Sequence, residues 1–428
     1  MENVRKKHIQ KNTLVIILLC CLGYFVSYLT RKNFSTAIAG IVEQTEFSKS
    51  QLGIVETALL ISYGVSQIVT GFLADKFKPQ NVVMSGLIIT TACNAVFPLF
   101  NSIAAFAVVW AINGIGQSMF WPAMVRIIAE YLSPIQYKWS CSLISTASQV
   151  ATILLYLLVP FVLDTIGYRW VFYIPAIVAG VTAVVWIVFY NINVKHCKKY
   201  EIERPASDGN VDTGEQKQKV RLAPIMISCG IITILFAIIL QGCLRDGVTA
   251  WIPSLVAASG AENASGAILK SVLLPVFTII ITYVGTYLYF KLFKNELIAT
   301  AIFFSLSAVC ILALFIFNYA NPDGLSIAKI IAAAIAVGLM HCTNLALISY
   351  IPAHFGKYNA VAFMSGLTNA FTYVGSAIST WGTALVAESF GWNAVVLVWL
   401  AIALLGIVVA LVTIRPWGRF LKKEYENQ

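Results

Sequence analysis

Two arginines in strongly apolar surroundings are the residues of this sequence best suited to bind an anion. Arg31 lies near the outer end of the first apolar stretch, and Arg245 lies well inside a later one. A charged side chain at the centre of a membrane span costs about 2.5 to 3.5 kcal/mol, so each needs a partner that offsets this cost. A guanidinium presents a planar fork of donors that matches phosphate or carboxylate. Two interpretations are open: an anion clamp, or an arginine that reaches the interface or pairs with a carboxylate such as Asp246.

Polar and aromatic residues recur at helical spacing around both arginines. Tyr24, Tyr28 and Arg31 are spaced i, i+4 and i+7 and therefore share one helix face. One-turn spacing recurs in four other pairs: Tyr63 and Gln67, Gln241 and Arg245, His341 and Asn344, and Asn369 and Tyr373. Any one such residue commonly serves helix packing. Polar faces on so many segments predict a wet internal cavity, because lipid-facing positions do not tolerate them.

The segments that carry these residues are long and apolar. The chain has 428 residues, of which 59% are hydrophobic and 11% are charged, and its mean hydropathy is +0.81. These values lie outside the range of soluble domains. About 20 apolar residues cross a hydrocarbon core, and twelve such runs predict an all-α integral membrane protein: 13–33, 51–74, 80–100, 103–131, 138–163, 170–193, 222–256, 266–290, 297–318, 326–350, 360–386 and 392–414.

The distribution of Lys and Arg predicts how these spans are oriented. Twenty-one of them fall on the side that holds both termini and the central loop, and four fall on the other side: Lys49, Arg169, Lys270 and Lys329. Cytoplasmic loops carry the excess of positive charge. We therefore expect a multi-pass protein of the bacterial inner membrane with both termini in the cytoplasm. Its net charge of +10 indicates membrane lipids as partners and gives no reason to expect nucleic acid.

One polar stretch divides the chain. Residues 194–221 are rich in charged residues and turn formers, so we predict a six-helix half at 1–193, a cytoplasmic linker at 194–221 and a second half at 222–428. Transporters built from two such halves hold their substrate between them near the midplane. Arg31 and Arg245 are 214 residues apart, half of the 428. A pseudo-two-fold axis would place them at comparable depth on opposite walls of one cavity.

The sequence gives no indication of a metal, a cofactor or a catalytic centre. Its nine cysteines are odd in number and lack the paired spacing of metal ligands, so neither a zinc site nor a disulfide framework is predicted. No spaced pair of acids and no nucleophile arrangement stands out in the loops. We expect a monomer that is not an enzyme.

Several segments resemble the organophosphate:phosphate antiporter family of the major facilitator superfamily, which includes the bacterial glycerol-3-phosphate and hexose-phosphate transporters. They are YLTRKNF (28–34), SYGVSQIVTGFLAD (62–75), NGIGQSMFWP (113–122), LRDGVTAWIP (244–253) and TYVGSAIS (372–379). The resemblance covers nearly the whole chain. It implies that Asp75, with Gly71, organises the cytoplasmic end of the second span in a gating role.

The resemblance also implies a substrate and a mechanism. Arg31 and Arg245 would hold the phosphate group of a small organic phosphate, which is exchanged for inorganic phosphate as the halves rock about a fixed site. The walls of the cavity would then be Tyr24, Tyr28, Tyr63, Trp121 and Tyr373.

Some positions depart from the family pattern. Ser148, followed by Gln149, stands where the bacterial members have a histidine, and Gln67 stands where the glycerol-3-phosphate transporter has a lysine. Two acids, Glu56 and Asp246, stand at positions where the family pattern gives no reason to expect a carboxylate. These changes leave room for a monoanion such as a carboxylate or a phosphodiester. The acids would either couple transport to protons or form plain ion pairs with the arginines.

The remaining predicted substrate-binding residues are Gln241 and His341. A histidine changes its charge near physiological pH, so His341 is either a charge-sensing group of the site or a hydrogen-bonded residue of helix packing. Two functional alternatives to antiport stay open on the same fold. One is a proton-coupled symporter or exporter of an organic anion, and the other is a membrane-bound organophosphate sensor.

The predicted orientation can be tested at the linker, which carries seven Lys or Arg residues between 194 and 221. We expect Asp208→Cys, in a background without the nine natural cysteines, to resist a membrane-impermeant maleimide in intact cells, because the positive-inside rule places it in the cytoplasm. Permeabilised cells serve as the control and should label readily. Rapid labelling of intact cells would reverse the orientation.

Overall fold

The computed structural model describes residues 2–47, 49–199, 222–257, 270, 272–293, 295–320 and 325–426. Residues 200–221 of the predicted linker lie outside the described residues. The described residues divide into two compact units. One comprises Met1–Gly209 with Ala353–Leu367, and the other comprises Asn210–Pro352 with Thr368–Gln428.

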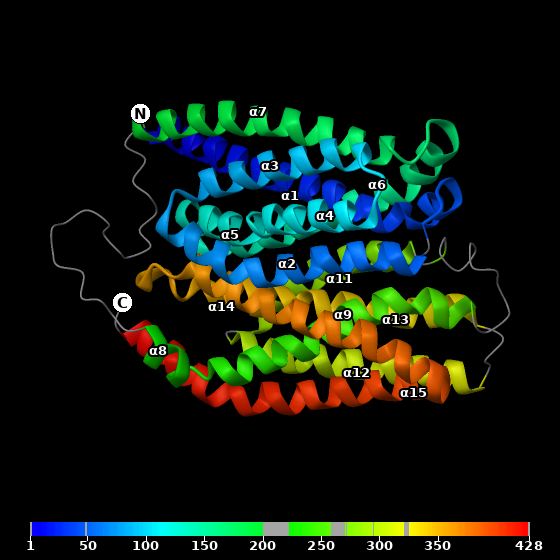
Figure 1. Ribbon diagram of the computed structural model, residues 1–428. Helices are drawn as coiled ribbons and strands as arrows, with labels where there is room; N and C mark the ends of the chain where they lie inside the picture. Colours follow the sequence, from blue (N-terminus) through cyan, green and yellow to red (C-terminus); the bar gives the residue numbers. More distant parts are fainter. Residues whose placement is uncertain are drawn as a thin grey trace. The chain divides into compact units, whose positions relative to one another are not determined.

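Helices make up almost all of the described part of the first unit, and they run side by side in Figure 1. They are α1 (Glu2–Gln44), α2 (Lys49–Lys76), α3 (Pro79–Val96), η1 (Phe97–Leu99), α4 (Ile103–Ser118), α5 (Phe120–Tyr131), α6 (Pro134–Thr165), α7 (Trp170–Lys199) and η3 (Gly356–Tyr358). The main packing partners are α2 with α4, α1 with α6 and α7, and α3 with α7.

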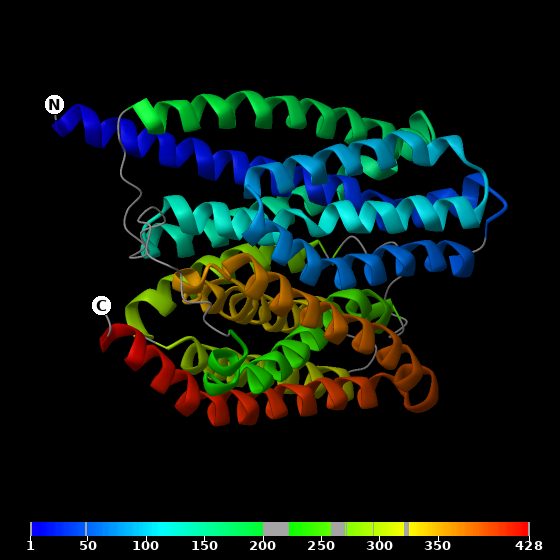
Figure 2. The same cartoon turned by 60° about the vertical axis from the view of Figure 1, so that its left-hand side comes forward.

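The second unit is helical in the same way. It contains α8 (Leu222–Ser228), α9 (Ile231–Ala257), α11 (Leu273–Leu292), α12 (Glu296–Ala320), α13 (Ser326–Leu345), η2 (Ala346–Tyr350) and α14 (Ile351–Ala353). The helix α13 packs against α9, α11 and α12 and so forms the middle of this unit. Figure 2 shows the helices in a turned view. The long helix α15 (Val361–Glu426) begins in the first unit and continues in the second.

Most of these helices suit a membrane, which confirms the predicted fold class. Eleven segments of the described chain are long and apolar enough to span a bilayer. The predicted span at 360–386 is not among them, although it is helical as the first part of α15. Its apolar character is diluted by buried polar residues, among them Ser365, Thr368, Asn369, Thr372 and Ser376. The predicted break before the last span falls at Gly391, whose φ of 78° is left-handed and favours glycine.

The sequence pattern of α2 shows how these helices satisfy two environments. Ile61, Val65, Val69 and Phe72 are exposed on one face, as suits contact with lipid. The opposite face buries Tyr63, Gln67 and Thr70. The polar side chains therefore point into the protein, and the apolar ones form the surface.

Aromatic rings form the core of the first unit next to Arg31. Phe34, one turn beyond Arg31 on α1, contacts Phe97, Trp110 and Phe172 at ring-centroid distances of 5.6, 5.4 and 6.3 Å. Phe97 also stacks on Phe172 with the centroids 4.3 Å apart. Such pairs hold helices at a fixed spacing and orientation, so this cluster joins α1, η1, α4 and α7 into one rigid body.

Glycines allow α9 and α15 to approach closely in the second unit. A Cβ atom on Gly242 would meet the Thr372 carbonyl, and a Cβ atom on Gly375 would meet the Ile239 carbonyl. Small residues at helix crossings permit close backbone packing of this kind. The contact brings the stretch of α9 that contains Arg245 against α15.

We expect Gly375→Ala to lower the melting temperature of the purified protein, because the added methyl group overpacks the contact with α9, at a typical cost of about 1–3 kcal/mol. The matched control is Gly382→Ala on the same helix, where an added Cβ atom would have no neighbour within 4 Å. Equal melting temperatures for the two variants would show that the glycine contact does not limit packing.

Candidate functional site

Arg31 lies in an aromatic enclosure in the first unit. Its side chain is buried, and its guanidinium carbon lies 4.4 Å from the centroid of the Tyr28 ring and 4.9 Å from that of Tyr63. Contacts of this kind stabilise a cation through the negative face of the ring. Tyr24 extends the cluster, with its ring centroid 5.2 Å from Tyr28 and 5.1 Å from Trp121. Five of the predicted site residues are thus brought together from α1, α2 and α5.

A buried network of amides and hydroxyls fixes the backbone of α1 on both sides of Arg31. The Thr30 carbonyl accepts hydrogen bonds from Asn94 Nδ2 and Asn113 Nδ2, both at 3.0 Å. Asn33 Nδ2 donates to Asn94 Oδ1 at 2.8 Å. Gln117 Nε2 donates to the hydroxyl of Thr30 at 2.9 Å. These five residues are at most 2% exposed, so α1 is held by α3 and α4 where Arg31 leaves it.

Gln67 lies one helical turn from Tyr63 and is fully buried. Neither its Nε2 nor its Oε1 has a hydrogen-bond partner among the described residues. A buried amide without partners costs free energy unless a ligand or water satisfies it. The position therefore suits a residue that meets a polar ligand beside the Arg31 cluster.

Glu56 lies within electrostatic reach of two cations of α1. These cations are Lys32 and Arg31. Its Oε2 atom has no hydrogen-bond partner in the described part of the chain. The added acid predicted from the sequence therefore lies in the neighbourhood of the Arg31 cluster.

Ser148 and Gln149 lie on α6. Ser148 is buried and donates its hydroxyl to the Ser145 carbonyl of the same helix at 2.6 Å, while Gln149 is half-buried. Among the hydrogen bonds described for this unit, none joins either residue to the Arg31 cluster. Their substrate-binding role stays a prediction.

In the second unit, Arg245 is engaged by its neighbour in the sequence. Its Nε donates to Asp246 Oδ1 at 2.7 Å, and a terminal nitrogen donates to Asp246 Oδ2 at 2.8 Å. This is the bidentate geometry in which guanidinium and carboxylate bind most strongly. The Ser376 hydroxyl of α15 also donates to Asp246 Oδ2. The ion-pair interpretation of these two residues therefore has direct geometric support.

Gln241 joins α9 to α13. Its Nε2 donates to the Met340 carbonyl at 3.1 Å, and its Oε1 accepts from Asn344 Nδ2 at 3.2 Å. His341 and Tyr373 are each half-buried. Beyond Asn344 the helix continues as the π-helical segment η2, a distortion that is frequent at functional sites.

Asp75 binds the start of α15 rather than a substrate. Its two carboxylate oxygens accept hydrogen bonds from the backbone nitrogens of Ala362, at 3.0 Å, and Phe363, at 2.6 Å. A carboxylate is favoured at a helix N-terminus, where backbone N–H groups lack partners. An Arg126 nitrogen lies 3.9 Å from Asp75 Oδ1. A Cβ atom on Gly71, one turn earlier, would lie 2.6 Å from the Ala362 carbonyl oxygen, so the helices pack closely here.

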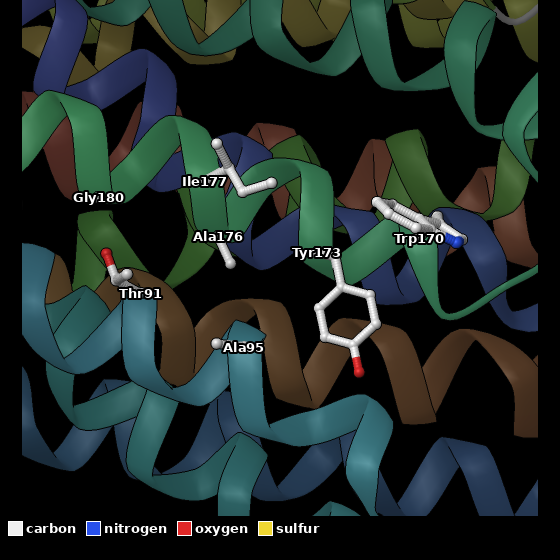
Figure 3. A pocket seen from close by; sticks show the side chains of 7 residues that line it. All are labelled: Thr91, Ala95, Trp170, Tyr173, Ala176, Ile177 and Gly180. Carbon is white, nitrogen blue, oxygen red and sulfur yellow. The ribbon is translucent and has the colours of Figure 1, made fainter.

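A separate pocket lies between α3 and α7 in the first unit. Figure 3 shows its lining, with Trp170 and Tyr173 from α7 beside Thr91 and Ala95 from α3. Its volume is about 600 Å³ and its lining contains no charged side chain. It therefore does not offer the charge that an anion site needs.

Residues 20–380 of the chain match the family model of the Major Facilitator Superfamily. The chain belongs to this superfamily. A proton:xylose symporter, XylE, solved with 6-bromo-6-deoxy-D-glucose, has a TM-score of 0.72 at 14% identity, with 93% of this chain and 95% of that chain covered. This likeness concerns the fold alone.

Curated relatives of this superfamily member fall in the group that the motifs predicted. It is 33% identical to a probable hexose phosphate transport protein of Chlamydia pneumoniae, over 36% of this chain and 34% of that protein. It is 24% identical to the glycerol-3-phosphate transporter of Bacillus subtilis, over 92% of this chain and 90% of that protein. It is 30% identical to the membrane sensor protein UhpC of Escherichia coli, over 41% of this chain and 39% of that protein. The first match spans only about a third of its relative, but the second extends along both chains, and the sequence resemblance is confirmed.

Several residues that form the contacts described above were not predicted from the sequence. Asn94 lies alone in an apolar run, where a single amide is commonplace. Asn113 and Gln117 are one helical turn apart in the quoted motif NGIGQSMFWP, and this spacing was a signal that could have found them. Arg126 lies in the fourth predicted span and was not recognised, although an arginine there carries the same signal as Arg31. Ser376 falls within a quoted motif, but no local pattern connects it to Asp246, which lies 130 residues away in the chain.

We expect Arg31→Lys and Arg245→Lys each to reduce transport about tenfold or more, because lysine keeps the charge but loses the planar fork and its charge-assisted bonds. Uptake into proteoliposomes measures the effect, and size-exclusion profiles check folding. The matched control is Arg169→Lys, since Arg169 is exposed and contacts only Asn101 among the described hydrogen bonds, at 3.4 Å. Normal uptake by either site variant would remove that arginine from the substrate site.

Proposed function

We propose that this protein is a secondary transporter that exchanges a small organic phosphate for inorganic phosphate by alternating access. The observation that carries the proposal is the buried Arg31 guanidinium, held between the rings of Tyr28 and Tyr63. A cation kept in this position supplies charge to an anion in surroundings where it is worth far more than in water.

The neighbours of Arg31 give the anion its orientation. Tyrosine hydroxyls donate hydrogen bonds, and Tyr24, Tyr28 and Tyr63 present three of them in one cluster. The Gln67 amide, which lacks partners among the described residues, adds donors and an acceptor. Such a set suits an oxyanion together with a hydroxylated organic group.

Exchange requires a contact that can open and close. The carboxylate of Asp75 holds the first turn of α15 through two backbone hydrogen bonds. We infer that these bonds break when the protein opens at this end and form again when it closes.

The names of the relatives support the substrate class. The glycerol-3-phosphate transporter of Bacillus subtilis matches this chain along almost its whole length. The match to the sensor UhpC favours a second candidate, a membrane-bound sensor of organic phosphates. A sensor would bind the same ligands without sustained turnover.

We expect purified protein in proteoliposomes loaded with inorganic phosphate to take up labelled glycerol-3-phosphate, and liposomes without internal phosphate to take up far less. An uncoupler should leave the exchange unchanged, because the two phosphate gradients drive it.

The alternatives give different results in the same assay. Uptake that collapses with the uncoupler and ignores internal phosphate would identify a proton-coupled symporter. Binding of glycerol-3-phosphate in calorimetry without exchange would identify a sensor. Neither binding nor uptake of any phosphate ester would contradict the substrate class.

A further inference from the structure

The pocket between α3 and α7 has apolar walls on both sides (Figure 3). Thr91 of α3 donates its hydroxyl to the Leu87 carbonyl of the same helix at 2.7 Å, so its oxygen is already satisfied. Its methyl group faces α7, where a Cβ atom on Gly180 would lie 3.6 Å from it. Ala95 and Ala176 add only small apolar side chains. The volume of about 600 Å³ therefore suits a hydrocarbon group better than a polar one.

The pocket opens on a face of α7 that suits contact with lipid. Ile174, Ile177, Val181 and Val184 share this face and are 39% to 62% exposed. Ile177 also lines the pocket, so the opening lies towards the hydrocarbon region of a bilayer. Apolar walls that no group fills lose van der Waals contacts. The acyl chain of a lipid is the group available there.

The pocket has the length of one leaflet and a marked polar end. Its wall on α7 runs from residue 170 to residue 180, a rise of about 15 Å, which is half of a hydrocarbon core about 30 Å thick. The rings of Trp170 and Tyr173 meet at one end, with their centroids 5.7 Å apart. Trp and Tyr are enriched where the membrane meets water. This end therefore lies at the level of the lipid headgroups.

Arg169 lies at the same end, immediately before the first residue of α7, and its side chain is exposed. Its only hydrogen bond in the described part of the chain goes from Nη2 to Asn101 Oδ1 at 3.4 Å, and it forms no ion pair there. A guanidinium has five N–H donors, so most of them stay available. The amide nitrogen of Asn101 adds donors beside them. The apolar groove thus ends at a cation that can receive an anionic headgroup.

The loop that carries Arg169 is held in place by Gln44 at the end of α1. Gln44 Nε2 donates to the Leu163 carbonyl at 2.9 Å, and Gln44 Oε1 accepts from the Tyr168 nitrogen at 2.9 Å. Gly167 makes the turn between them, with a left-handed φ of 88°. Asp164, the acid of this loop, is exposed and forms no ion pair with Arg169 in the described chain. The arginine is therefore presented at a fixed point beside the groove.

We propose that the groove between α3 and α7 binds one anionic phospholipid, with an acyl chain along residues 170–180 and the phosphate on Arg169. This inference goes beyond the proposed function, because it concerns a lipid of the bilayer and not the transported anion. Apolar contact alone would not select this lipid, since all acyl chains are alike in this respect. The charge-assisted bonds between guanidinium and phosphate supply the selectivity.

Native mass spectrometry of the full-length protein in detergent tests the proposal. The protein is mixed with equal amounts of phosphatidylglycerol, which is anionic, and phosphatidylcholine, which is zwitterionic, both with the same acyl chains. We expect the first bound lipid to be phosphatidylglycerol about fivefold more often, because one basic residue at a membrane surface contributes on this scale.

Variants of Arg169 test the headgroup contact. Arg169→Gln should bring the ratio of the two bound lipids towards one, because it removes the charge. Arg169→Lys should keep most of the preference, since lysine still binds phosphate as a point charge. The matched control is Arg419→Gln, which removes an exposed arginine from α15 of the second unit and should leave the ratio unchanged.

Variants of the groove test the position of the acyl chain. Gly180→Leu fills the groove from α7 and Thr91→Leu fills it from α3, so each should lower the occupancy of the first bound lipid several-fold. The matched control is Gly53→Leu on α2, where an added Cβ atom would have no neighbour within 4 Å. If one of the groove variants fails to fold, the other decides the question.

Equal binding of the two lipids by the natural protein would overturn the proposal, and so would a preference for phosphatidylglycerol that survives Arg169→Gln. Loss of occupancy in the groove variants without a headgroup preference would indicate a groove that accepts any acyl chain, which contradicts the anionic ligand. Undiminished occupancy in a folded groove variant would place the lipid elsewhere and overturn the assignment of this site. None of these results depends on which solute the protein transports.

Discussion

A guanidinium enclosed by apolar helices has to be stabilised by the side chains that fold around it, and this requirement shapes the first unit. Arg31 is placed between two tyrosine rings, and the backbone of α1 is pinned beside it by amides of α3 and α4. The aromatic core built on Phe34 begins one turn away. The cation, its binding partners and the rigid core that holds them therefore form one continuous arrangement.

In the second unit, the arginine is stabilised by a carboxylate. Asp246 neutralises Arg245 through two hydrogen bonds, and Ser376 holds the carboxylate in turn. Removal of Asp246 would leave the charge of the buried Arg245 side chain without this partner. The two arginines thus differ in how their charge is compensated, by aromatic rings at Arg31 and by a carboxylate at Arg245.

In the proposed mechanism, the contact of Asp75 with α15 is one that separates and forms again. The Asp75 carboxylate accepts hydrogen bonds from two backbone nitrogens of the first turn of α15, and the Asp75 carbonyl accepts one from Asn359 Nδ2. The nearby glycine at position 71 lets the two helices touch without interlocking side chains.

Much of the fold of this protein was predictable from the sequence, because the membrane requires long apolar runs that are easy to recognise. Spans of about 20 apolar residues are required by the bilayer itself, so the helices and the break at Gly391 could be read from composition. The face shared by Tyr24, Tyr28 and Arg31 follows from helical periodicity. The superfamily was recognised from its motifs, which are local in sequence.

Only the tertiary structure decided which polar residues meet. No spacing along the chain indicates that Asn94 and Asn113 bind the Thr30 carbonyl, or that Ser376 holds Asp246. The sequence left Arg245 open to two interpretations, and the folded chain provided the geometry of the ion pair. The physical reason is that periodicity fixes the face on which a side chain lies, whereas its partner depends on which helix packs there and how closely glycines such as Gly242 and Gly375 allow the backbones to approach.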